Sequence, residues 1–457
     1  MNTIRIDLSK TYGIIKPMHA VNNGPTAPNV RSTKKTSFDL YKKASFPYAR
    51  NHDASFYGPY GGEHIVDVHR IFKNFDADEN DPASYWFEPT DRYLKLTLDA
   101  GTKIFYRLGA SIEHYFKYGT RVPKDFAKWA RICEHIIMHY NEGWANGFHY
   151  NIEYWEIWNE PDCLNADGSN PCWQGTEEQF IDLYEVAAKH FKSRFPKLKI
   201  GGPAFCNWET TPFKTKFLNA VKERNIPLDF YSYHWYGNDL SYFEKMIINA
   251  QEELKSSGLD GTPTIINEWN YIRGWLNEEW DYSLKTEKNL KGASFISGVM
   301  CLAQANPLDM LMYYEARPCA MNGLFDEKTF KIQKPYYPFL MFSHLAKLGS
   351  YVKHENSIPD VYVCTAKNSD EAALMLTYYN DNDDGYHKDI PVAESSKEIS
   401  LDISNVFDDG NTKIQYYLLD DEHNAELFKE EKFNGKSLKI NLDMSLYSTY
   451  LIKIKKQ

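Results

Sequence analysis

The amino-acid sequence predicts an α/β protein with a (β/α)8 TIM barrel and a smaller antiparallel β-sandwich domain. From residue 14 to about 349, short segments rich in β-forming residues alternate with segments of helical periodicity. From about residue 350 onward the pattern changes to the two-residue alternation of antiparallel strands. We therefore assign residues 14–349 to the barrel, and residues 1–13 plus 350–457 to the sandwich. A chain of 457 residues exceeds what one hydrophobic core usually organises, which also favours two domains.

Eight strands are expected in the barrel, and helix candidates lie between them. The strand candidates are residues 14–20, 46–51, 103–108, 154–159, 199–203, 229–235, 262–268 and 308–314. The helix candidates are residues 82–98, 125–144, 177–195, 212–224, 240–256 and 292–304, each bounded by Pro, Gly or Asn. Eight such units fit a barrel, which typically takes about 250 residues and more with insertions. A doubly wound open sheet is the alternative, but no G-x-G-x-x-G follows the first strand.

The sandwich is predicted from five alternating segments after the barrel: residues 360–366, 371–379, 398–403, 412–419 and 437–455, with a turn near 380–387. Residues 3–8 alternate as well, so we expect the N-terminal strand to join the sandwich. Residues 56–80 are rich in Gly, His and Asp and follow the second barrel strand. Long loops at that end of a barrel usually build the pocket.

Composition excludes several classes of partner. A net charge of −10 gives no electrostatic reason to expect nucleic acid or an anionic membrane. No apolar run approaches the length that spans a bilayer. The seven cysteines show no C-x-x-C spacing, which argues against a zinc site, and we expect no cofactor. Residues 1–10 contain no secretory signal, so the odd cysteine count predicts reduced thiols in a cytoplasmic protein.

Two barrel strands end in the same way, with an amide and a carboxylate. The run W-E-I-W-N-E-P-D from Trp155 places Asn159 and Glu160 before a proline, and Asn267 precedes Glu268 in a second strand. Because parallel barrel strands point their C-terminal ends at one shared mouth, the two glutamates should face each other. Taken alone, Asn159-Glu160-Pro161 could also be an ordinary turn.

A facing pair of carboxylates is the minimal apparatus for glycoside hydrolysis. One protonated acid gives a proton to the leaving oxygen, and the other carboxylate attacks the anomeric carbon or activates water toward it. The distance between the two groups decides the stereochemistry. Carboxyl groups about 5–5.5 Å apart leave no room for water and require a covalent intermediate with retention of configuration.

A series of collinear stretches carries a family resemblance. They are K-P-M-H-A-V-N-N-G-P from Lys16, Y-A-R-N-H-D from Tyr48, Y-G-G-E-H from Tyr60, F-D-A-D from Phe75, F-Y-R-L-G from Phe105, I-C-E-H-I-I from Ile132 and the W-E-I-W-N-E-P-D run. With them, essentially the whole chain resembles the glycoside hydrolases of clan A. Within that clan it resembles family 39, which contains β-xylosidases and α-iduronidases.

The resemblance implies roles for individual residues. It makes Glu160 the general acid/base, Glu268 the nucleophile and Asn159 the residue that holds the sugar 2-hydroxyl. Since strict alternation would turn Asn159 and Glu160 to opposite faces, we expect a bulge or a strand end there. The resemblance also implies that His52 binds sugar, that His234 contacts the site, and that Tyr236 hydrogen-bonds the nucleophile. An aromatic cluster such as His234-Trp235-Tyr236 would, on its own, more often be core.

Other candidates keep two interpretations. Arg50 could donate to the nucleophile or form a salt bridge inside the barrel. Glu315 resembles an acceptor for a substrate hydroxyl, and a salt bridge to Arg317 is its alternative. The loop aromatics could form the floor of the sugar site or a contact between subunits of a homo-oligomer; they are Phe116, Trp173 and Trp275.

Tyr236 also bears on the choice of sugar. Members of the family that act on iduronides carry a basic residue where this chain has Tyr236, so we expect a neutral sugar, first of all β-linked xylose at the end of an oligosaccharide. Trp269 and Arg273 depart from the xylosidase pattern, and Arg273 could bind an acidic group. The alternatives are an arabinose- or galactose-type sugar, a uronide, or a carbohydrate-binding protein without catalysis. That last class predicts loss of one carboxylate, whereas both are present.

Overall fold

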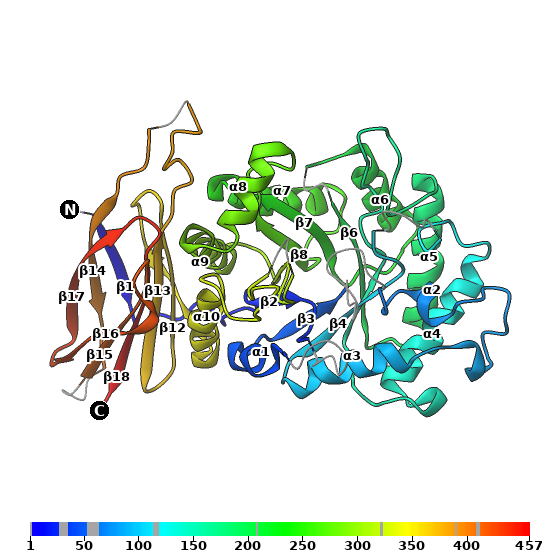
Figure 1. Cartoon of the computed structure of the whole chain (residues 1–457), viewed down its shortest axis with the longest axis horizontal. Helices are drawn as coiled ribbons and strands as arrows, with labels where there is room; N and C mark the ends of the chain where they lie inside the picture. Colours follow the sequence, from blue (N-terminus) through cyan, green and yellow to red (C-terminus); the bar gives the residue numbers. More distant parts are fainter. Residues whose placement is uncertain are drawn as a thin grey trace.

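The computed structural model confirms the predicted combination of a (β/α)8 barrel with a β-sandwich (Figure 1). It describes residues 2–26, 35–52, 64–112, 118–206, 209–319, 323–388, 391–407 and 412–457. The closed barrel lies on one side of the molecule in Figure 1, and the sandwich lies on the other, next to helices α9 (Leu290–Ala305) and α10 (Tyr336–Leu348). Among the described residues, no helix is both long and apolar enough to cross a bilayer.

The barrel strands are all parallel to their neighbours, and the last one closes on the first. In order they are β2 (Ala20–Asn22), β3 (Tyr48–Asn51), β4 (Lys103–Leu108), β5 (Tyr154–Ile157), β6 (Lys199–Phe205), β7 (Tyr231–Gly237), β8 (Thr264–Tyr271) and β9 (Met310–Tyr313).

The first barrel strand begins later than predicted. Residues 14–19 were expected to be strand, but Ile14 forms a bridge with Ser350 and the Lys16 amide donates to the side chain of Gln304. These contacts tie the segment to the start of the sandwich and to α9, so only Ala20 and the two residues after it pair within the barrel.

Helices cover the barrel between the strands. They are α1 (Phe38–Ala44), α2 (Val68–Ile71), α3 (Glu88–Asp99), α4 (Phe126–Asn141), α5 (Glu177–Arg194), α6 (Pro212–Glu223), α7 (Leu240–Ser256), α8 (Asn277–Thr286), α9 and α10, with 3-10 turns η1 (Pro82–Ser84) and η2 (Trp144–Asn146). The helix predicted over 82–98 is divided, because Pro82 opens a separate 3-10 turn and a second proline, Pro89, stands in the first turn of α3.

The sandwich consists of a four-stranded sheet, ordered β11-β1-β14-β17, and a six-stranded sheet, ordered β10-β12-β13-β18-β15-β16. Its strands are β1 (Thr3–Asp7), β10 (Ser350–Val352), β11 (His354–Glu355), β12 (Val361–Lys367), β13 (Glu371–Tyr378), β14 (Ser396–Ser404), β15 (Thr412–Leu419), β16 (Asn424–Phe433), β17 (Ser437–Ser445) and β18 (Thr449–Lys456).

The N-terminal strand joins this sandwich as expected, pairing in parallel with β14 and antiparallel with β11. Two sandwich features were not predicted. Residues 437–455 form two strands instead of one, and β16 was missed because its side chains are mostly charged and exposed, so they carry no apolar alternation. We retain the division into residues 14–349 and residues 1–13 plus 350–457 as a proposal for the domain boundaries.

The loop after β13 reaches the barrel mouth from the sandwich. The Lys291 ammonium on α9 lies 3.0 Å from Asp381 and 2.7 Å from Asp383 of that loop. The amide of Asn238, just after β7, donates to the Asp381 carboxylate, as does the Tyr271 hydroxyl at the end of β8. The sandwich thereby braces the C-terminal ends of β7 and β8, which carry site residues.

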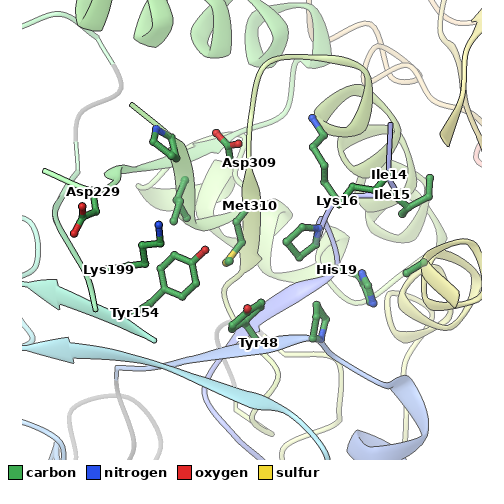
Figure 2. Close-up of a pocket in the computed structure, with 15 residues that line it drawn as sticks. Ile14, Ile15, Lys16, His19, Tyr48, Tyr154, Lys199, Asp229, Asp309 and Met310 are labelled. Carbon is green, nitrogen blue, oxygen red and sulfur yellow. The ribbon is translucent and has the colours of Figure 1, made fainter. Parts of the chain in front are cut away.

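A cavity of about 460 Å³ lies at the opposite, N-terminal end of the barrel. Figure 2 shows its lining side chains, among them Tyr48, Tyr154 and Lys199 at the starts of β3, β5 and β6. Side chains at this end of a (β/α)8 barrel usually serve stability, whereas catalytic side chains stand at the C-terminal end. Because the cavity lies at the N-terminal end, it is remote from Glu160 and Glu268 at the barrel mouth.

Candidate active site

Glu160 reaches the barrel mouth because the chain leaves β5 in an irregular conformation. The backbone torsion φ is +77° at Trp158 and +48° at Glu160, so the alternation of the strand stops after Ile157. The Trp158 ring covers Gly109, where an added Cβ would stand 2.7 Å from the indole. The Glu160 amide donates to the carbonyl of Ala204, near the C-terminal end of β6, at 2.9 Å. The expected strand end is present, and Asn159 and Glu160 both lie at the mouth.

Glu160 lies in surroundings that favour its neutral form. Burial raises the pKa of the Glu160 carboxyl well above its usual value, and negative charge on Cys163 and Asp162 would raise it further, while Arg50 opposes the shift. His234 Nδ1 lies 2.8 Å from one Glu160 oxygen. Burial lowers the pKa of His234 to about 4, so this partner is a neutral imidazole near pH 7. Glu160 is therefore placed to hold a proton.

Glu268 has the opposite surroundings. It stands within β8, and its oxygens accept hydrogen bonds from Arg50 Nη1 at 2.7 Å and from the Tyr236 hydroxyl at 2.9 Å. His52 Nε2 lies 3.4 Å from the oxygen that Arg50 contacts. Because Arg107 Nε donates to His52 Nδ1, the ring carries its proton on Nε2, facing the carboxylate. These donors stabilise the ionised form of Glu268.

The two carboxylates lie close together. One oxygen of Glu160, one oxygen of Glu268 and a ring nitrogen of His234 all lie within 4.8 Å of one another. A carboxyl that favours its proton thus stands beside a carboxylate held in its charged form. Such a pair can act as an acid and a nucleophile at the same time.

Arg50 makes both of the contacts that the sequence left open. Its fully buried guanidinium donates to Glu268, and it also forms a salt bridge with Glu156 at 2.7 Å. Its third nitrogen, Nη2, donates to Asn159 Oδ1 at 2.7 Å. Glu156 was missed as a functional residue, although a lone carboxylate inside the apolar run of β5 signals a buried charge that needs a partner. A similar signal marks Arg107 in β4, which contacts Asp67 as well as His52.

Of the two contacts predicted for Glu315, the structure has the salt bridge to Arg317, and the contact with a substrate hydroxyl stays a prediction. Glu315 is buried just after β9, accepts a hydrogen bond from the Asn23 amide, and lies 3.1 Å from Arg317. The salt bridge is present, and a carboxylate with these neighbours can still accept from a sugar hydroxyl. Asn23 was not singled out from the sequence, although it stands in the K-P-M-H-A-V-N-N-G-P stretch.

The aromatic residues predicted in the loops differ in their burial and contacts. Trp275 is 53% exposed and stacks on Trp280, with its edge against Tyr236 at a centroid distance of 5.2 Å, so it lies at the rim of the site. Trp173 is buried against Trp158 and donates to a backbone carbonyl, so the expectation of a sugar platform or a subunit contact is wrong for it. Phe116 lies outside the described residues.

Two departures from the xylosidase pattern are explained by packing. Trp269 is fully buried against Phe295 and Tyr313, on the outer side of the barrel wall. Arg273 is already paired with Glu279 and Asp384, each at 2.8 Å. The expectation that Arg273 could bind an acidic group of the substrate is therefore not supported by its contacts.

Two contrasting carboxylates at the mouth of a parallel eight-stranded barrel are the pair of groups that glycoside hydrolysis by an acid and a nucleophile requires. The family model "Glycosyl hydrolases family 39" matches residues 13–306, and the chain belongs to this family.

Among characterised proteins, the chain is 30% identical to a β-xylosidase of Geobacillus stearothermophilus over 278 residues, which cover 54% of this chain and 51% of that protein. It is 23% identical to the α-L-iduronidase of Canis lupus familiaris over 244 residues, 49% of this chain and 35% of that protein. The chain thus spans about half or less of the length of these relatives.

Among solved structures, a glucosidase from Croceicoccus marinus superimposes with a TM-score of 0.79 at 19% identity, and the match covers 100% of this chain and 99% of that one. At this identity the likeness shows the fold alone. It extends over both the barrel and the sandwich.

The protonation state of Glu160 can be measured directly. Because its pKa is raised, Glu160 should keep its proton at pH values where an exposed glutamate has lost it, and should release it only as the pH rises further. We expect the infrared carbonyl band of a protonated carboxyl at pH 6–7. The spectrum of Glu160→Gln should lack that band, and the spectrum of Glu278→Gln, at an exposed position in the first turn of α8, should keep it. Equal loss in both variants, or no band, would contradict the assignment.

Proposed function

We propose that this chain is a retaining glycoside hydrolase that removes a neutral sugar, most readily β-linked xylose, from the end of an oligosaccharide. The observation that carries the proposal is the proximity of Glu160 and Glu268, with oxygens within 4.8 Å, in surroundings that favour opposite protonation states. This spacing supports retention, which needs carboxyl groups about 5–5.5 Å apart, whereas inverting enzymes need about 6.5–9.5 Å.

In the first step, Glu160 gives its proton to the glycosidic oxygen while an oxygen of Glu268 attacks the anomeric carbon. The carbon–oxygen bond to the leaving group breaks, its electron pair stays with the leaving oxygen, and a glycosyl ester forms on Glu268. The ester carries no charge, so the pKa of Glu160 falls once the neighbouring carboxylate is gone. Glu160 can then take a proton from water, which attacks the same carbon and releases Glu268.

Asn159 is well oriented for the sugar 2-hydroxyl. Its carbonyl oxygen accepts from Arg50, so its amide nitrogen is the atom turned to the other side. A hydrogen bond from this group to the 2-hydroxyl would strengthen as the ring approaches an oxocarbenium ion. His52 beside Glu268, and Glu315 beyond β9, are proposed to contact further hydroxyls. His234 is proposed to orient Glu160.

The charges around the site favour a neutral sugar. Arg50, Arg273 and Arg317 each contact carboxylates of the protein, and Tyr236 donates its hydroxyl to Glu268. A uronate carboxylate would need a cation to offset its loss of water. Similarity to a β-xylosidase supports xylose, whereas similarity to an α-L-iduronidase keeps a uronide as the second candidate.

We further propose a cytoplasmic location, since all seven cysteines lie in the described ranges and are present there as thiols. No cofactor enters the proposed mechanism. Self-association through the exposed rim around Trp275 stays a prediction.

A carbohydrate-binding protein without catalysis is the alternative from another class of function. That alternative gives no reason for two carboxylates in such different surroundings.

The Tyr236 hydroxyl should contribute to catalysis through Glu268. Replacement of Tyr236 by Phe removes one donor to the nucleophile, and a hydrogen bond to a charged group contributes about 1.5–3 kcal/mol. We expect kcat/KM for an aryl β-xyloside to fall roughly 10- to 100-fold. Tyr242→Phe, on an exposed part of α7, is the matched control and should keep the wild-type value. An unchanged kcat/KM in Tyr236→Phe would show that the tyrosine hydroxyl does not contribute to catalysis.

The stereochemistry can be tested by chemical rescue. Glu160→Ala should lose about 10²–10⁴-fold in kcat/KM on a substrate that needs acid assistance. With an activated aryl β-xyloside, the glycosyl ester still forms, and added azide should restore turnover and give the β-glycosyl azide. Glu268→Ala is the comparison, because attack by azide in place of the nucleophile should give the α-azide. An α-azide from Glu160→Ala would rule out retention by these residues.

A comparison of two substrates tests the identity of the sugar. We expect hydrolysis of a nitrophenyl β-xyloside at least tenfold faster in kcat/KM than hydrolysis of a nitrophenyl α-iduronide. Preference for the iduronide would overturn the neutral-sugar proposal and leave the two-carboxylate mechanism in place. A nitrophenyl β-glucoside in the same series tests whether the site accepts a sugar with an additional hydroxymethyl group.

A further inference from the structure

Three cysteines from two loops gather near Glu160. Cys163 and Cys172 lie in the loop between β5 and α5, and Cys206 follows directly after β6. The thiol of Cys163 is hydrogen-bonded to those of Cys172 and Cys206. Cys172 Sγ lies 3.7 Å from Glu160 Oε2, the carboxylate oxygen that does not contact His234.

The backbone holds these thiols in place. The Cys163 amide donates to the Glu160 carbonyl at 3.1 Å. The Cys172 amide donates to Asn170 Oδ1 at 2.8 Å, and the Cys206 amide donates to Asp162 Oδ1 at 2.9 Å. Each thiol is therefore fixed by a contact made within two adjoining loops, and Cys172 is fully buried, while Cys163 and Cys206 remain partly accessible.

The geometry matches that of a small tetrahedral metal site. One ligand atom each from Glu160, Cys163 and Cys172 lie within 4.8 Å of one another. In a tetrahedral zinc site with Zn–S about 2.3 Å and Zn–O about 2.0 Å, sulfur and oxygen ligands stand roughly 3.5 Å apart. The separation of 3.7 Å between Cys172 Sγ and Glu160 Oε2 is close to this value.

We propose that Cys163 and Cys172, together with Glu160, form a binding site for a thiophilic divalent cation such as Zn²⁺ or Cd²⁺, and that the bound cation blocks Glu160. Thiolates are preferred by such metals, whereas Mg²⁺ and Ca²⁺ prefer oxygen ligands. Spacing along the chain gave little sign of this site, because eight residues separate Cys163 from Cys172 and no C-x-x-C is present.

Binding would change the protonation of the three ligand groups. Hydrogen bonding to Cys163, together with burial, raises the pKa values of the Cys172 and Cys206 thiols, so without metal they keep their protons. A divalent cation would displace the protons of the thiols that ligate it and that of Glu160. A Glu160 carboxylate that ligates the cation has no proton to give to a glycosidic oxygen. This inhibition rests on the proposed function of Glu160, whereas metal binding does not.

A second metal arrangement at the same place provides the contrast. Glu160, His234 and Glu268 also offer ligand atoms within 4.8 Å of one another. A cation held there would be bound by one imidazole and two carboxylates, and would not depend on any cysteine. Substitution of Cys163 therefore separates the two arrangements.

The test is a titration of the purified protein with Cd²⁺, followed by the ultraviolet sulfur-to-cadmium charge-transfer absorption, in parallel with Zn²⁺ inhibition of aryl β-xyloside hydrolysis. We expect one thiolate-bound Cd²⁺ per chain. In Cys163→Ala and Cys172→Ala the absorption should shrink, and the Zn²⁺ concentration for half-inhibition, measured against each variant's own metal-free rate, should rise at least tenfold. Cys133→Ala, in the buried face of α4, is the matched control and should behave as wild type.

Three results would overturn the proposal. Absence of the charge-transfer absorption in the wild type, or its full persistence in both Cys163→Ala and Cys172→Ala, would show that these two thiols do not bind the metal. Equal Zn²⁺ inhibition of wild type and both variants would show that the inhibitory cation lies elsewhere, as in the His234 arrangement. A protein that binds Cd²⁺ through thiolates but hydrolyses no glycoside would refute the proposed function and keep the metal site.

Discussion

The buried guanidinium of Arg50 is the contact on which the rest of the active site depends. It bridges three strands of the barrel, because it lies on β3 and donates to Glu156 of β5, to Asn159 beyond β5 and to Glu268 of β8. A fully buried cation needs charged partners, and here the carboxylate partners are one structural and one proposed catalytic glutamate. Closure of the barrel brings these groups together, so fold and site are specified by the same interactions.

The two proposed catalytic glutamates differ in their favoured protonation state because of this arrangement. Glu268 receives donors from Arg50 and Tyr236, whereas Glu160, placed by the irregular exit from β5, has a neutral histidine and thiols as its nearest partners. Burial without a cation in direct contact favours the protonated acid, and burial with such a cation favours the carboxylate. One barrel mouth can thus hold an acid and a nucleophile at the same pH.

Much of this could be predicted from the sequence, since the barrel strands are rich in β-forming residues and the two Asn-Glu pairs mark Glu160 and Glu268. Glu268 was expected at a strand end, but β8 continues for three more residues to Tyr271. Sequence reasoning failed where the decisive partner is distant along the chain. Residues 14–19 were expected to be strand, but Lys16 bonds to Gln304 and Ile14 bridges to Ser350. Arg273 was left open to substrate but is paired with Asp384 of the sandwich, and Trp173 packs into the core. The exposed, charged strand β16 has no apolar alternation that would reveal it.

Covalent trapping tests most directly whether Glu268 attacks the anomeric carbon while Glu160 serves as the acid. A 2-deoxy-2-fluoro-β-xyloside with an activated leaving group slows breakdown of a glycosyl ester, so the ester accumulates and can be located by mass spectrometry of peptic peptides. We expect one fluoroxylosyl group per chain, on the peptide that contains Glu268. A label on Glu160, or hydrolysis of the reagent without any covalent adduct, would contradict it.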